Sequence, residues 1–200
     1  MMVAGEMGGR MTLSLPVSDD ANALLSRSPL ALLIGMLLDQ QVTIEKAFSS
    51  PAVLVERLGH EPDTRELAAY DPEALAALFA ERPALHRYPR AMAARVQDMC
   101  RLIADRYDGD AAGVWSGAQS GDELVKRVAE LPGFGAQKAR IFAALLGKQL
   151  GVRPEGWREA TGPFGDEATY LSVADIVDED SLAQVRAYKQ QLKAAAKARR

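Results

Sequence analysis

Apolar residues recur at helical spacing through most of the chain, and no segment alternates apolar and polar residues for long enough to predict a strand. Residues 30–38 are apolar on nearly every side, which predicts a helix buried at the centre of a helical domain. A long amphipathic pattern follows Tyr88–Pro89 and continues through Met92, Val96, Met99 and Ile103. β-Branched residues are scarce beside Ala and Leu. We therefore predict an all-α fold.

Residues that commonly cap helices mark where many of these segments begin. The predicted N-caps are Ser18, Ser28, Thr43, Asp63, Asp71 and Asp122. Ser50–Pro51 is expected to end one short helix, and a second one then runs as far as Gly59. After Gly151 the chain is rich in loop-forming residues until a last helix begins near Ser181.

The composition is that of a globular chain: 200 residues, of which 48% are hydrophobic and 26% charged, enough for one domain or two small associated ones. A single cysteine, Cys100, allows no intramolecular disulfide and no cysteine-ligated zinc or four-cysteine iron–sulfur site, so we expect no metal and no cofactor. The same cysteine content favours a cytoplasmic location. No apolar run is long enough to span a membrane, and residues 1–16 are predicted to be a disordered leader.

The formal net charge of -3 by itself argues against a nucleic-acid partner. The charges are not evenly distributed, however. Residues 163–184 carry six acids and no base, whereas residues 186–200 carry six bases and no acid. Residues 133–158 are also basic, with five bases and one acid. The total excludes indiscriminate coating of DNA and leaves room for local binding of phosphate.

The most informative segment is residues 123–146, in which the turn LPGFG joins two predicted helices. A Gly-x-Gly turn lets the backbone approach a partner closely and leaves free N–H groups at the start of the second helix. With the helix dipole, such groups can hold a phosphate, and Lys138 and Arg140 could add contacts. The alternative is a tight turn between helices in which the glycines serve only the backbone geometry.

The sequence LPGFGAQKA resembles the helix–hairpin–helix of the HhH-GPD base-excision DNA glycosylases, and LLIGMLLDQQVTIEKAF resembles an early buried helix and glutamine-containing turn of that family. The resemblance covers residues 30–157. It implies two helical subdomains flanking a cleft. Residues 30–150 would form a six-helix-barrel-like domain that contains the hairpin (123–146), and residues 17–29 with 151–200 would form the second subdomain, with a basic tail.

The resemblance also assigns roles to residues. It implies that Gly133 and Gly135, with Phe134 between them, hold a DNA phosphate together with Lys138. Gln40 or Gln41 would lie near the lesion. The position of the family's nucleophilic lysine is occupied by Gln137, which we expect to contact the DNA, and the lysine is displaced to Lys138. We therefore do not expect abasic-site lyase activity. Members that carry an iron–sulfur cluster have four C-terminal cysteines, which this sequence lacks.

For catalysis the resemblance implies a carboxylate that assists hydrolysis of an N-glycosidic bond. Glu155 occupies the position of the family's aspartate. Asp39 is the second candidate, although it could equally be a surface residue at a helix end. The expected substrate is double-stranded DNA with a damaged or mismatched base, flipped out of the stack by a monomeric, monofunctional glycosylase.

Two other functions fit the same sequence. The chain could be a helix–hairpin–helix DNA-binding protein that has lost the chemistry, or a helical interaction module whose glycine turn is architectural. Two aromatic regions each have two possible roles as well. The group from His86 to Tyr88 could stack on opened DNA or form a solvated loop, and Trp157 could line a base pocket or anchor a loop.

Overall fold

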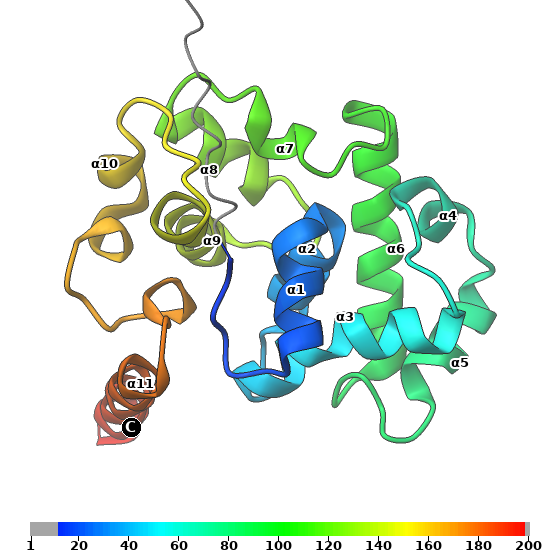
Figure 1. The fold of residues 1–200 in the computed structure, drawn as a ribbon, viewed down its shortest axis with the longest axis horizontal. Helices are drawn as coiled ribbons and strands as arrows, with labels where there is room; N and C mark the ends of the chain where they lie inside the picture. Colours follow the sequence, from blue (N-terminus) through cyan, green and yellow to red (C-terminus); the bar gives the residue numbers. More distant parts are fainter. Residues whose placement is uncertain (1–11, 199–200) are drawn as a thin grey trace, which may run out of the picture.

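The computed structural model describes residues 12–198, which form helices joined by short loops (Figure 1). The helices are α1 Asp19–Arg27, α2 Pro29–Leu38, α3 Ile44–Leu58, α4 Thr64–Ala69, α5 Pro72–Ala80, α6 Pro89–Arg106, α7 Gly113–Ser116, α8 Gly121–Ala129, α9 Ala136–Gln149, α10 Trp157–Thr161, η1 Gly162–Gly165, η2 Val173–Asp175 and α11 Glu179–Ala198. Within the described residues no strand is present, and the one β-type contact is an isolated bridge between Ser120 and Glu155. The prediction of an all-α fold is confirmed.

Helix α2 is the central element, as its continuous apolar sequence predicts. Nine of its residues, from Leu30 to Leu38, are buried. It packs closely on α3, because a Cβ added at Gly35 would lie 2.8 Å from the ring of Phe48. In Figure 1, α1 and α2 lie between a group formed by α3 to α6 and a group formed by α8 to α11.

Most of the predicted helix starts are confirmed. The side chains of Ser18, Ser28, Thr43, Asp63 and Asp71 each accept a hydrogen bond from a backbone N–H in the first turn. The prediction for α8 is wrong by two residues. Ser120 is its N-cap and accepts from the N–H of Glu123, while Asp122 lies inside the first turn.

The predicted helix break at Pro51 is also wrong, because α3 runs through this residue. Proline removes one hydrogen bond from a helix interior and costs about 3 kcal/mol or more. The cost is offset by packing: Phe48 and Leu54, on either side of the proline, are both fully buried in the core. The hydroxyl of Ser50 lies 2.7 Å from the carbonyl oxygens of both Lys46 and Leu85, which ties this part of α3 to a neighbouring loop.

The start of the described chain corrects part of the expected leader. Leu13 and Leu15 are buried. Their N–H groups donate to the side chains of Ser26 and Asn22 in α1, both at 2.9 Å. Residues 12–16 are therefore part of the fold, because they bury two leucines against α1. Residues 1–11 lie outside the described part of the chain.

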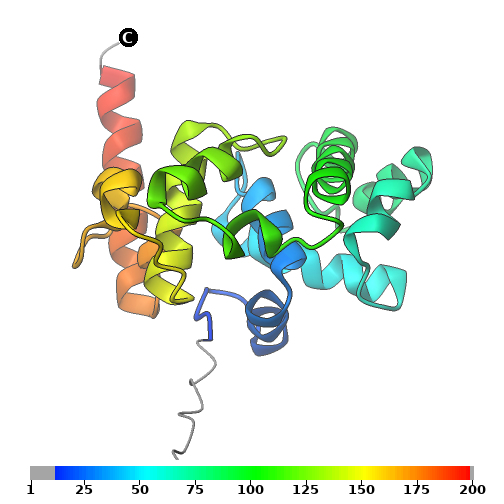
Figure 2. The ribbon, with the colours of Figure 1, turned by 90° about the horizontal axis from the view of Figure 1, so that it is seen from above.

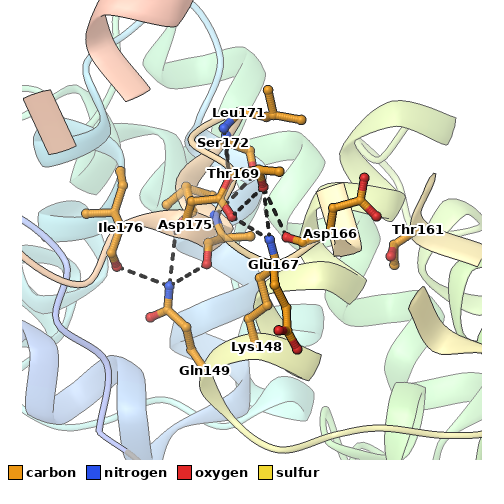
Figure 3. A network of polar contacts seen from close by, with 12 residues as sticks. Lys148, Gln149, Thr161, Asp166, Glu167, Thr169, Leu171, Ser172, Asp175 and Ile176 are labelled. Carbon is orange, nitrogen blue, oxygen red and sulfur yellow. Dashed lines mark hydrogen bonds and ion pairs between the residues drawn. The ribbon is translucent and has the colours of Figure 1, made fainter. Parts of the chain in front are cut away.

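The region after Gly151 contains short helices that the sequence pattern did not predict. A buried polar network holds them against α9 (Figure 3). The carboxylate of Asp175 in η2 accepts from Lys148 at 2.5 Å and from the N–H groups of Leu171 and Ser172. Next to it, the side-chain amide of Gln149 lies near three carbonyl oxygens of η2 and its flank. Because the contacts of Lys148 and Gln149 join residues 24 to 27 positions apart in the sequence, helical periodicity could not reveal them.

One hydrophobic cluster extends through the described residues from Leu13 to Val185. It joins the group around α6 to the group around α9, so both share a core. Among residues 12–198 no single helix is long and apolar enough to cross a membrane; α1 and α2 reach that length only as a pair, bent by 114°.

Candidate functional site

The glycine turn lies between α8 and α9, with its polar backbone facing solvent. Gly133 has a φ of +86°, in the left-handed region that favours glycine, and the residues on either side of it close the turn through a hydrogen bond from Phe134 N–H to Leu131 O. Gly135, the N-cap of α9, is exposed and offers no side chain to the first amides of the helix. The start of α9 therefore presents its N–H groups and the positive end of its dipole to solvent.

Phe134 does not share this exposure, although it stands between the two glycines. Its side chain is 5% exposed and packs edge-on against Phe142, with 5.9 Å between ring centroids. The aromatic ring thus anchors the turn to the core. This placement leaves only the backbone of Phe134 for the expected contact with DNA.

Lys138 points inward to α2. Its Nζ donates to the carbonyl oxygen of Leu37 at 3.1 Å and lies 5.9 Å from the centroid of the Phe134 ring. Burial lowers the pKa of Lys138, and the nearby Asp39 opposes that effect. The side chain therefore ties the hairpin helix to the end of α2. The expected phosphate contact would require it to leave Leu37, whereas Gln137, one residue earlier, is exposed.

Asp39 is the C-cap of α2, where its N–H donates to the carbonyl oxygen of Met36. Burial raises the pKa of its carboxyl group, while the positive charges of Lys189 and Lys138 act in the opposite direction. The carboxylate thus lies where the end of α2 meets charges from α9 and α11. Of the two predicted carboxylates, Asp39 is the one that the fold brings together with the hairpin helix.

Gln40 links the same corner to α6 and to the loop before it. Its side-chain N–H group donates to Leu37 O at 2.8 Å, and its side-chain oxygen accepts from Arg95 at 3.2 Å. Its backbone oxygen lies 2.8 Å from Nε2 of His86. Since Nδ1 of His86 accepts from the N–H of Tyr88, Nε2 carries the proton that is donated to Gln40.

Gln41 and His86, which flank the same corner, differ in their exposure to solvent. Gln41 is exposed, and its φ of +56° is uncommon for a residue with a side chain. Such backbone strain tends to collect at functional sites. His86 is 2% exposed, so it braces the turn after α2 and does not reach solvent, while its neighbour Tyr88 is 44% exposed.

Glu155 lies apart from this corner. Its side chain is exposed, and its backbone oxygen accepts from the N–H of Gly121 at 2.7 Å, at the first turn of α8. The glycine turn follows the opposite end of α8, about 14 Å away along nine residues of helix. Asp39 and Glu155 therefore do not converge on one another.

Trp157 follows Glu155 and is buried against α9, where a Cβ added at Gly147 would lie 2.5 Å from its ring. The guanidinium groups of Arg158 and Arg153 lie over the same ring. This placement is that of an anchor for the loop after α9. Within the described residues, no group of three or more His, Cys, Asp or Glu side chains could hold a metal ion.

The family model of the HhH-GPD superfamily base excision DNA repair proteins matches residues 34–200, which include the second half of α2, all helices from α3 to α11, the glycine turn and Asp39. The chain belongs to this superfamily. No curated protein and no solved structure matches it. As an HhH-GPD protein it takes part in base excision DNA repair and acts on DNA.

Sequence reasoning about this HhH-GPD protein missed two members of the site. Arg95 lies 55 residues from the Gln40 side chain that it contacts, and Lys189 lies on the last helix, beyond residues 30–157, over which the sequence motifs resemble the family. Neither belongs to a motif. Both are ordinary basic residues of amphipathic helices, so only the packing of α6 and α11 reveals them.

Proposed function

We propose that the protein is a monofunctional DNA glycosylase in which Asp39 assists hydrolysis of the bond between a damaged or mismatched base and its sugar. The observation that carries this proposal is the convergence of a partly buried carboxyl group of raised pKa with the hairpin helix, through Lys138. A carboxylate of raised pKa is a stronger base than an ordinary aspartate, which suits it to take a proton from water.

The reaction itself needs few groups. The target nucleotide is turned out of the duplex toward Asp39. The bond between the sugar C1′ and the base nitrogen breaks, and the electron pair leaves with the base. Water adds to C1′ as Asp39 accepts its proton, and the negative charge of the carboxylate stabilises the positive charge that develops on the sugar.

The surrounding residues position this carboxylate against the DNA. Lys138 and Gln40 both donate to the carbonyl oxygen of Leu37, which fixes the end of α2 relative to α9. The exposed turn from Gly133 to Gly135 would hold a backbone phosphate next to the site. Gln41 is exposed beside Asp39 and would contact the DNA near the lesion. Because one chain supplies both the hairpin and the carboxylate, we infer that a monomer is sufficient.

The test measures base release from duplexes that carry alkylated, oxidised, deaminated or mismatched bases. We expect Asp39→Asn to lower the rate by about 10²- to 10⁴-fold, the usual contribution of a general acid or base. Glu155→Gln is the matched control and should retain activity. Strands should break only after alkali, because Gln137 replaces the amine that would open an abasic site.

The opposite result would also be informative. Loss of activity in Glu155→Gln with activity retained in Asp39→Asn would assign the chemistry to Glu155. Salt-dependent binding to duplex DNA without base release from any substrate would favour the second candidate, a helix–hairpin–helix DNA-binding protein without chemistry. The distance of Glu155 from the glycine turn is the observation that supports this candidate.

A further inference from the structure

Helix α11 leaves the body of the protein after its first two turns. Only Ser181, Leu182 and Val185 are buried in it, and every residue from 190 to 198 is exposed. In Figure 2 the helix projects beyond the other elements. A helix segment without tertiary contacts gains no stability from packing, so its sequence has to be explained by something other than the core.

The basic residues of α11 lie on one side of the helix. Arg186, Lys189, Lys193 and Lys197 follow one another at intervals of three, four and four residues, which places them within about 80° of the circumference. We call these four residues the basic stripe. No acid follows Asp180 in the helix, so nothing on α11 neutralises it. Lysines four residues apart repel one another, which disfavours this arrangement in water alone.

The basic stripe begins at the candidate site. Arg186 forms an ion pair with Glu45, in the first turn of α3 and close after the turn that contains Gln40. Lys189, the next member, is near enough to Asp39 to lower the pKa of its carboxyl group. Lys193 and Lys197 then continue outward along the free part of the helix. The stripe thus leads from the proposed reaction centre to a region beyond the body of the protein.

We propose that Lys189, Lys193 and Lys197 bind the sugar–phosphate backbone of duplex DNA that is held at the glycine turn. The proposal rests on the proposed function and extends its DNA surface from the hairpin to α11. The three lysines span eight residues, or about 12 Å of helix. Phosphates of one strand follow at about 3.4 Å along the duplex axis, so the stripe covers three to four of them. Binding also relieves the repulsion between the lysines.

The experiment measures the affinity of the full chain for a labelled undamaged duplex over a series of salt concentrations. Each phosphate that a lysine neutralises contributes about 0.9 to the slope of log affinity against log salt. The variant with Lys189, Lys193 and Lys197 all changed to Gln should therefore lose about 2.7 from that slope. Changing only Lys193 and Lys197 to Gln leaves the charges around Asp39 intact and should reduce the magnitude of the slope by about 1.8. Glutamine preserves helix propensity, and circular dichroism checks that the helix remains.

The matched control removes three exposed bases elsewhere: Arg27, Arg65 and Arg101 changed to Gln. Arg27 precedes the end of α2 that is opposite Asp39, and Arg65 lies on α4, on the other side of the molecule from α11 in Figures 1 and 2. This variant should keep the wild-type slope. Equal slopes for the lysine and control variants would overturn the proposal.

The outcomes also separate this proposal from the proposed function. If the wild type releases bases and the lysine variants keep its salt slope, α11 is not part of the DNA surface although the glycosylase assignment stands. If the wild type binds undamaged duplex with the expected loss of slope in the variants but releases no base, the DNA surface stands and the glycosylase assignment fails. A wild type that does not bind duplex DNA at all overturns both.

Discussion

Asp39 carries a carboxyl group in a position where its ionised form is disfavoured. Burial raises its pKa, and the charges of Lys189 and Lys138 offset only part of that effect. Between the unfolded and folded pKa values, the folded chain therefore binds more protons than the unfolded chain, and the stability falls as the pH rises through this interval. At neutral pH the ionised carboxylate continues to lower the free energy of unfolding.

From this argument we expect Asp39→Asn to raise the midpoint of thermal unfolding at pH 7, even as it lowers base release. The gain should shrink as the pH falls through the folded pKa and disappear below about pH 3, where the carboxyl group is protonated in both states. Thermal melts at a series of pH values check this. Glu155→Gln, which removes an exposed carboxylate, is the control and should leave the midpoint unchanged; a lower midpoint for Asp39→Asn at pH 7 would contradict the argument.

The hairpin depends on its two glycines for different reasons. Gly133 needs the left-handed conformation, and a Cβ there would also lie 3.1 Å from the side chain of Leu37. Gly135 has an ordinary φ of -83°, and a Cβ added to it would meet no atom within 4 Å. The first glycine is therefore required by the fold, whereas the second leaves open space in front of the start of α9.

We accordingly expect Gly133→Ala to lower the stability by about 1–2 kcal/mol, the cost of the left-handed conformation for a residue with a side chain. Gly135→Ala should change the stability by less than about 0.5 kcal/mol. If the turn approaches a phosphate closely, Gly135→Ala should nevertheless weaken DNA binding, because its methyl group would occupy the space that the phosphate needs. Denaturant melts and binding isotherms measured on both variants check this pair, and unchanged binding by Gly135→Ala would favour a purely architectural turn.

At the level of the whole molecule, the helices on both sides of α2 share one core. Residues of α6, α9 and η2 all belong to the same hydrophobic cluster. The division into residues 30–150 and a second subdomain stays a prediction, but a shared core couples the two parts energetically. The net charge of -3 conceals an uneven distribution of charge, since acidic and basic segments are segregated along the chain.

We therefore expect the protein to unfold in one cooperative transition. Calorimetric and van't Hoff enthalpies should agree, and tryptophan fluorescence should change together with far-ultraviolet circular dichroism. The two tryptophans, in α7 and α10, both pack on α9, so their fluorescence reports the surroundings of α9 while circular dichroism reports all helices. Two separate transitions would show that the two parts fold independently.

Local signals in the sequence were sufficient for most of the longer helices and for the family, but not for the short helices after Gly151. Caps such as Ser28 and Asp71 act within one turn, and the apolar run of α2 could be stabilised only by burial. The LPGFG turn was identified from five consecutive residues. These features depend on neighbours in the chain, so their physical consequences could be predicted without the structure.

The break predicted at Pro51 shows where such local reasoning ends, because packing of Phe48 and Leu54 outweighs the missing hydrogen bond. The same applies to the site. Lys138 meets Leu37 across 101 residues, and Arg95 meets Gln40 across 55. Only the tertiary structure decides which carboxylate lies beside the hairpin helix, since that depends on how α2, α6, α9 and α11 pack together.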